Sequence, residues 1–228
     1  DRTGRAFSNI EKQLNSINNR GRAVVATIAG IATGSVARGI IQQYRAYERT
    51  HTALKAFLGS QRKASAEIER VSNLANRLGQ DVDGMRNAFT IFTRFGLDTS
   101  SEALTAFSNI ATASGKSMEQ LGEAVADALT GEFERLKEFG IKVSKENGKF
   151  VARIGNDQVA LANSTEDLVK QLTELGNTRW GGLSEEQAKT LDGSLIKLRN
   201  ATKTTSETIA KELSPSLKQA ADLTTDWL

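Results

Sequence analysis

The chain of 228 residues contains no cysteine and a single histidine, His51. Without cysteine it forms no disulfide and has no thiolate nucleophile or thiolate metal ligand. One histidine cannot build a histidine-rich zinc site, and His51 lies in a Thr- and Arg-rich stretch that gives no credible Ser-His-Asp set. We therefore predict no catalytic residue, no cofactor and no metal site in this chain.

Proline and aromatic residues are also scarce. Pro215 is the one proline, so almost nothing in the sequence removes a backbone donor from a helix. Aromatic residues make up 6% of the chain, which leaves packing mainly to alanine, leucine and isoleucine. The 19 glycines then serve as the breaks between helices. This composition predicts a mainly α fold.

Positive charge is concentrated near the N-terminus. Residues 1–50 carry eight basic and three acidic side chains, a net charge of +5, whereas the remainder carries −2. A solvated helix face is the simplest explanation, and an acidic partner is the alternative. No helix-turn-helix or RNA-binding signature is present, so any contact with DNA would be non-specific and based on charge.

Apolar side chains recur at alternating spacings of three and four within the first 31 residues. This is heptad spacing, and over about four heptads it predicts a helix that packs against other helices along one stripe. Gly21 falls on this stripe and weakens it. The predicted seam residues are Phe7, Ile10, Leu14, Ile17, Val24, Ile28 and Ile31.

An uncharged run, AVVATIAGIATGSVA, occupies residues 23–37. It is shorter than the roughly 20 apolar residues of a membrane span and rich in small residues, which favours a buried helix. Insertion in a host membrane is the alternative, and a GxxxG pair within the run would let two helices approach closely. The candidates for insertion are Val24, Val25, Ile28, Gly30, Ile31, Gly34 and Val36.

The pattern along the chain predicts three parts. Residues 1–60 form a long helical, coiled-coil-like segment that contains the uncharged run. Residues 61–183 form a compact helical domain with one small β-hairpin at about residues 141–154. Residues 184–228 form long C-terminal helices that we expect to continue into a longer protein.

Short helices of the middle part are marked by glycine stops and polar caps. The breaks at Gly79, Gly96 and Gly115 are 17 and 19 residues apart, which suits a bundle of short amphipathic helices. Side chains that accept hydrogen bonds precede each helix. The predicted caps are Asp81 or Asp83, Asp98 or Thr99, and Ser117, which forms a capping box with Gln120.

The hairpin is predicted from alternating apolar and polar residues on either side of Asn147-Gly148. Asn-Gly suits a type I′ turn because both residues tolerate positive φ. Two strands alone are marginally stable, so we expect the hairpin to pack on the helices.

Beyond the hairpin the pattern is again helical. Ser164 is a candidate cap for a helix that ends at Gly176, and a long polar helix is expected over residues 184–213. Pro215 fits the first turn of a last helix. The residues expected to anchor the long helix are Leu191, Leu195, Leu198 and Ile209.

Two short motifs that suggest ligand sites are rejected. Gly115-Lys116-Ser117 contains part of a P-loop, but Ile110 occupies the position of the first glycine and no strand precedes it. Asp81-Val82-Asp83-Gly84 begins like a calcium loop, but Met85 and Phe92 occupy two positions that require oxygen ligands. Helix breaking and capping explain both stretches.

Residues 107–141, FSNIATASGKSMEQLGEAVADALTGEFERLKEFGI, resemble the N-terminal region of phage tail tape measure proteins. In that region of tape measure proteins, four features recur in order. They are a helix of small residues, a break at Ser and Gly, a helix that contains Leu-Gly, and a final Leu-x-x-x-Gly-Ile stretch. The resemblance covers residues 23–160 well and the remainder loosely. Tape measure proteins are usually many hundreds of residues long, so the chain would be a fragment.

The resemblance implies a structural virion component that sets tail length, scaffolds the assembly of the tail tube and is released during genome ejection. Implied partners are further copies of the chain in a parallel trimer or hexamer, the tail-tube protein, tail assembly chaperones and tail-tip or baseplate proteins. It also implies assembly in the host cytoplasm and a final location in the lumen of the tail tube. A membrane-active secreted toxin or effector and a cytosolic helical adaptor remain the alternatives.

Overall fold

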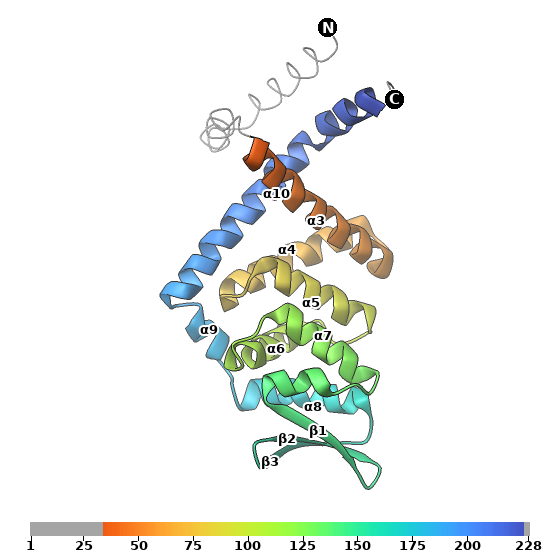
Figure 1. Cartoon of the computed structure of the whole chain (residues 1–228), viewed down its shortest axis with the longest axis vertical. Coiled ribbons are helices and arrows are strands. Elements are labelled where there is room, and N and C mark those ends of the chain that lie inside the picture. The colour runs from red at the N-terminus through yellow and green to blue at the C-terminus, as the bar shows by residue number, and fades with distance from the viewer. Residues whose placement is uncertain (1–33, 226–228) are drawn as a thin grey trace. The chain divides into compact units, whose positions relative to one another are not determined.

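The computed structural model describes residues 34–225, which are mostly helical (Figure 1). This range contains nine helices and one small antiparallel sheet of three strands, so the mainly α prediction is confirmed. The long N-terminal coiled-coil segment stays a prediction. All seven seam residues lie outside the described residues, as do five of the candidates for membrane insertion, while Gly34 and Val36 lie in the first turn of α3.

Contacts divide the chain into two compact units, and the boundaries fall within helices. One unit spans Thr50–Asn200, and the other combines residues 1–49 with residues 201–228. Helix α3 (Gly34–Leu58) and helix α10 (Leu191–Thr225) each run from one unit into the other.

The second unit is described through residues 34–49 of α3 and residues 201–225 of α10. Gln43 Nε2 of α3 donates a hydrogen bond of 3.2 Å to Glu207 Oε1 of α10. Helix α10 continues through Pro215, so the predicted start of a new helix there is wrong. A proline removes the one hydrogen bond that its own N–H would make, and the helix on both sides retains its other bonds.

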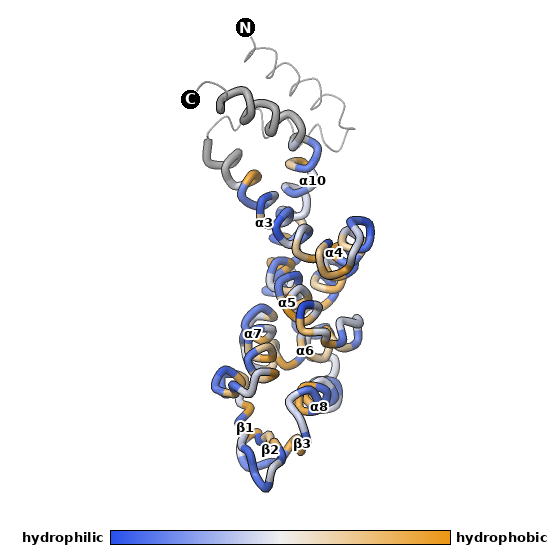
Figure 2. Tube along the Cα trace, turned by 90° about the vertical axis from the view of Figure 1, so that its right-hand side faces the viewer, coloured by the Kyte–Doolittle hydropathy of each residue, from blue (hydrophilic) through white to orange (hydrophobic). Residues whose placement is uncertain are grey.

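The Thr50–Asn200 unit is built mainly from five short helices. These are α4 (Gln61–Leu78), α5 (Val82–Arg94), α6 (Ser101–Ala113), α7 (Met118–Leu129) and α8 (Thr165–Thr178). Apolar residues recur along each of them (Figure 2). The largest fully buried side chains of these helices are Leu78, Met85, Phe89, Phe92, Leu104, Phe107, Ile110, Met118 and Leu121.

Side-chain caps define where these helices begin. Asp81 caps α5 and Ser117 caps α7, where both bonds of the predicted capping box with Gln120 are present. The predicted cap of α6, Asp98 or Thr99, is wrong because Ser100 occupies that position. Asp98 instead accepts a 2.8 Å hydrogen bond from the Ser100 backbone N–H and so shapes the turn before the cap.

The predicted hairpin is confirmed as β1 (Ile141–Glu146) and β2 (Lys149–Ile154), with Asn147 at positive φ in the turn. A 3₁₀ helix, η1 (Glu134–Phe139), leads into β1. A third strand, β3 (Asp157–Ala162), pairs antiparallel with β2 and was not predicted.

Helix α8 packs against β3 and closes part of its outer edge. Gln171 donates from Nε2 to the Leu161 carbonyl and accepts at Oε1 from the Leu161 N–H, both at 2.9 Å. The third strand and this helix together provide the support that two strands alone would lack.

Gly176 does not end α8, contrary to the prediction, because the helix continues to Thr178. The glycine instead lies where α8 meets α6. A Cβ atom at this position would lie 2.3 Å from the Ala106 carbonyl oxygen, so no larger residue fits without moving the helices apart.

The long polar helix expected from Ser184 is also interrupted. A short helix, α9 (Leu183–Gln187), precedes α10, and the two are separated by a turn at residues 188–190. Gly193 allows this turn to lie close to α10, because a Cβ there would be 2.7 Å from the Ala188 Cα.

Replacing Gly176 with alanine should lower the free energy of unfolding by about 1–3 kcal/mol, because the added methyl group overlaps the α6 backbone. Urea denaturation measures this loss. Gly84→Ala is the matched control, since the nearest atom to its new Cβ is 3.8 Å away and the change should stay within about 1 kcal/mol. Equal effects of the two substitutions would contradict the close approach at Gly176.

The ion pair between Glu146 and Arg153 should make stability depend on pH. Two guanidinium N–H groups of Arg153 bind the carboxylate at 2.6 and 3.0 Å, and the Ser144 hydroxyl donates at 2.7 Å. The Arg153 bond, followed by the Ser144 bond, lowers the pKa of Glu146 to about 2. A carboxyl with a lowered pKa stabilises the fold above its unfolded pKa of about 4.3 and loses this contribution as pH falls toward 2.

Arg153→Gln should therefore lower the Tm slightly at neutral pH, and the difference from the wild type should vanish at about pH 2. The effect is small because the pair is exposed to solvent. Lys189→Gln removes the same charge away from the sheet and controls for net charge. A Tm difference between wild type and Arg153→Gln that is unchanged down to pH 2 would exclude the ion pair as its cause.

Candidate functional site

An apolar groove of about 740 Å³ lies within the Thr50–Asn200 unit. Helices α6 and α8 form its walls, with the loop that follows α5 and the end of α7. Ala103, Phe107 and Val169 line its buried part, and the Phe95 side chain at its mouth is 39% exposed. Such a recess offers apolar surface to a partner side chain without exposing the core.

Charged side chains around the groove are mainly acidic. Asp98 and Glu102 lie on the α6 side, Glu166 and Glu174 on α8, and Lys170 is the one basic residue among the described residues that line it. All five are exposed to solvent. The groove therefore carries net negative charge, which attracts cations.

Two carboxylates in the first turn of α8 have lowered pKa values, and one of them, Glu166, lines the groove. Hydrogen bonds from the backbone N–H of Glu166 and from the hydroxyls of Ser164 and Thr165 lower the pKa of the Glu166 carboxyl. The pKa of Asp167 is lowered chiefly by its 3.0 Å hydrogen bond from the Asn163 N–H. Both carboxylates also benefit from the positive end of the helix dipole.

The sequence pattern predicted both helices, with the cap of α6 misplaced, but not that their first-turn carboxylates share a groove. Glu102 lies in the first turn of α6 and Glu166 in the first turn of α8. Acidic residues are common in first turns, so each one separately has a local explanation. Only the packing of α6 against α8 brings them together.

A buried asparagine of α6 ties three segments of the unit together. Asn109 of α6 accepts at Oδ1 from the Ser184 backbone N–H at 3.0 Å and from the Ser184 hydroxyl at 2.7 Å. Its Nδ2 donates to the Gly176 carbonyl of α8 at 3.4 Å. Asn109 is 1% exposed, so these bonds satisfy an amide that has almost no access to water.

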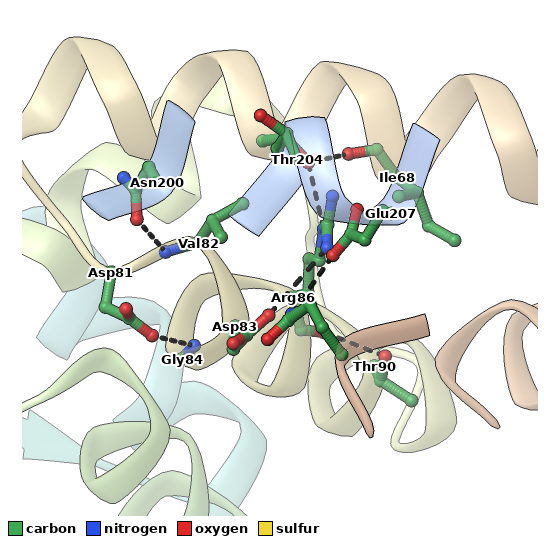
Figure 3. A network of polar contacts seen from close by, with 12 residues as sticks. Ile68, Asp81, Val82, Asp83, Gly84, Arg86, Thr90, Asn200, Thr204 and Glu207 are labelled. Atoms are coloured by element: carbon green, nitrogen blue, oxygen red, sulfur yellow. Dashed lines mark hydrogen bonds and ion pairs between the residues drawn. The ribbon is translucent and has the colours of Figure 1, made fainter. Parts of the chain in front are cut away.

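A second buried asparagine fixes the beginning of α10. Asn200 Oδ1 accepts from the Val82 backbone N–H at 3.0 Å, beside the Asp81 cap (Figure 3). Asn200 Nδ2 donates to Asn76 Oδ1 and to the Gln80 carbonyl. One side chain thus joins α4, the start of α5 and α10 within the Thr50–Asn200 unit.

Arg86 of α5 is buried in the same unit and is held on more than one side. Its Nε donates to the Ser72 hydroxyl at 2.9 Å, and that hydroxyl donates to the Ile68 carbonyl at 2.5 Å. Asp83 lies 3.8 Å from Arg86 Nη1 and forms an ion pair with it (Figure 3). Buried charges require such partners, so Arg86 has a structural role here.

Three leucines expected as anchors of the long C-terminal helix point to solvent instead. Leu191 is 77% exposed, Leu195 is 55% exposed and Leu198 is 65% exposed, so this expectation is wrong. We call these three residues the leucine face. Ile209, the fourth expected anchor, is buried.

The rejected motifs have structural explanations in the described range. Gly115 has positive φ and ends the α6 segment, and Ser117 caps α7. Asp81 caps α5, and His51 Nε2 lies 3.0 Å from the Ser65 hydroxyl. Residues 34–225 contain no cluster of three or more His, Asp or Glu side chains suited to a metal ion.

Among the helices of residues 34–225, none combines the length and the apolar character that a membrane span requires. Comparison of the chain with protein-family models, with curated proteins and with solved structures gives no match.

Replacing Asn109 with alanine should lower the free energy of unfolding by about 2–4 kcal/mol, because buried groups of Ser184 and Gly176 lose their partner. Urea denaturation followed by circular dichroism measures the loss. Asn177→Ala removes an exposed amide from the groove and should change stability by less than about 0.5 kcal/mol. A loss of the same size in both variants would contradict the proposed anchoring role of Asn109.

Proposed function

We propose that the chain is part of a phage or prophage tail tape measure protein. The observation that carries the proposal is the resemblance of residues 107–141, together with the order of patterns over residues 23–160. In this proposal the protein sets tail length, scaffolds the tail tube during assembly and leaves the tail when the genome is ejected.

The positions of the helix breaks support the proposal. Residues of the resembling stretch form α6, the break at Gly115, α7 and η1, and the stretch ends at Gly140-Ile141, where β1 begins. Gly115, Gly131 and Gly140 lie at helix ends and Ser117 caps α7, whereas Ser108 and Gly122 lie inside α6 and α7.

Helical structure also suits a molecular ruler. An α-helix rises about 1.5 Å per residue, so the length of a helical chain converts directly into distance along a tube. In the proposed assembly, three or six parallel copies associate through the seam of residues 7–31, inside the lumen of the tail tube. The tail-tube protein, assembly chaperones and tail-tip or baseplate proteins are the proposed partners.

Quantitative mass spectrometry of purified particles tests the proposal. Particles are induced from the source strain, and peptides of this chain are counted against peptides of the tail-tube protein. We expect a few copies per tail, far fewer than the tube protein, because a ruler spans the tube whereas tube subunits line its whole length. Particles from a strain that lacks the gene serve as the control.

Absence of the chain from intact particles would overturn the proposal. A copy number that rises with the number of tube subunits would also contradict it, because that ratio indicates a building block of the tube wall. In either case, leakage from lipid vesicles would next test the toxin or effector alternative.

A further inference from the structure

The leucine face is a continuous apolar strip on an otherwise polar helix surface. Leu191, Leu195 and Leu198 are spaced by four and three residues, which places them on one side of α10. All three side chains are more than half exposed. Contiguous exposed leucines at this spacing are typical of a surface that another helix covers.

The opposite side of α10 is fixed, so the leucines cannot turn inward. Asn200 and Gly193 are buried there. Lys197 Nζ donates to the Ala188 carbonyl at 2.7 Å, and Asn200 makes the three hydrogen bonds described above. Rotation of the helix to bury the leucines would break all of these contacts.

We propose that the leucine face pairs with the leucine face of a second copy of this chain, in an antiparallel arrangement about a two-fold axis. Such an interface is self-complementary, since each copy supplies the same strip. The inference goes beyond the proposed function and does not rest on it.

Charge complementarity identifies the occupant as a second copy. Asp192 and Arg199 are both exposed and flank the leucine face on the same side, seven residues apart. In a two-fold antiparallel pair, this flank lies beside the same flank of the other helix. Each copy therefore brings one acid and one base to the shared flank.

The register follows from placing Leu195 level with Leu198 of the second copy. Asp192 is then level with position 201 of the second copy, two residues from Arg199, which is about 3 Å along the helix axis. The two-fold axis repeats this contact, so the pair gains two ion pairs. It also gains two contacts between Leu195 and Leu198.

Shifted registers and a parallel orientation do not place Asp192 beside Arg199 of the other copy. A shift of one heptad in either direction brings Asp192 beside Asp192 of the other copy, or Arg199 beside Arg199, and like charges repel. A parallel pair places Arg199 across from Ser194, which is uncharged. The second flank of the strip, Ser194 and Ala201, is small and uncharged, which permits close approach in the antiparallel register.

Sedimentation of the full chain over a concentration series tests whether the copies pair. We expect a reversible shift from one chain to two, and Leu195→Glu should remain a single chain throughout. Leu161→Glu is the matched control, because Leu161 is also exposed, at 44%, but lies on β3; this variant should still pair. A wild-type chain that stays single at all concentrations would overturn the inference.

Charge reversal tests the register. Asp192→Arg alone and Arg199→Asp alone should each weaken the pair about tenfold, because two attractive contacts become repulsive. The double variant, D192R with R199D, should restore the wild-type Kd to within about threefold. Failure of the double variant to recover would overturn the proposed register, provided that circular dichroism shows it folded.

Disulfide formation tests the orientation, since the natural chain has no cysteine. We expect Leu195→Cys mixed with Leu198→Cys to yield cross-linked pairs that contain one of each, well above the yield from either variant alone. Efficient cross-linking of each variant with itself would indicate a parallel pair and overturn the inference. These outcomes are independent of whether the chain is found in phage particles.

Discussion

The close approach of α6 and α8 is the constraint on which the Thr50–Asn200 unit depends. Gly176 brings the backbone of α8 against the Ala106 carbonyl, and Asn109 bonds across the same contact to the Gly176 carbonyl. A similar approach joins α5 and α7, where a Cβ on Gly122 would lie 3.0 Å from the Ala88 Cα. A core poor in aromatic residues fills its interior by drawing helices together at small residues.

Local signals in the sequence predicted most of the elements. Glycine stops, the Asp81 cap, the Ser117 capping box and the Asn147-Gly148 turn depend on a few neighbouring residues, so each can be recognised without the fold. The third strand also had a local signal, because Gly155-Asn156 is a two-residue turn of the kind that joins hairpin strands. Its alternation is weak, since Ala160 and Ala162 are its buried residues.

Features that depend on distant contacts could not be predicted. Gly176 resembles a helix stop in sequence, but it lies inside α8 and permits the close contact with α6, which the sequence does not reveal. Leucines 191, 195 and 198 have the spacing of a buried face, but the hydrogen bonds of Asn200 select the opposite side of α10 for burial. The groove likewise arises from two helix starts that are more than 60 residues apart in the sequence.

The two proposed assemblies differ in polarity. A tail has a capsid end and a tip end, so a ruler must align its copies in the same direction, whereas a two-fold antiparallel pair has equivalent ends. The antiparallel pair therefore describes copies in solution. A chain that uses both arrangements must separate its leucine faces before its copies align within a tube.

The hydrogen bonds of Gln171 to β3 have a consequence for aggregation. A fibril grows by adding strands to the edges of its sheets. Each unit in a fibril therefore needs unpaired backbone N–H and C=O groups on both edge strands. At Leu161, the outer edge of β3 already has its N–H and C=O bonded to a side chain of the same unit. An incoming strand would have to displace the Gln171 side-chain amide, which belongs to the same unit and therefore stays next to β3. At Leu161, this edge of the sheet is thereby protected from pairing with a further strand.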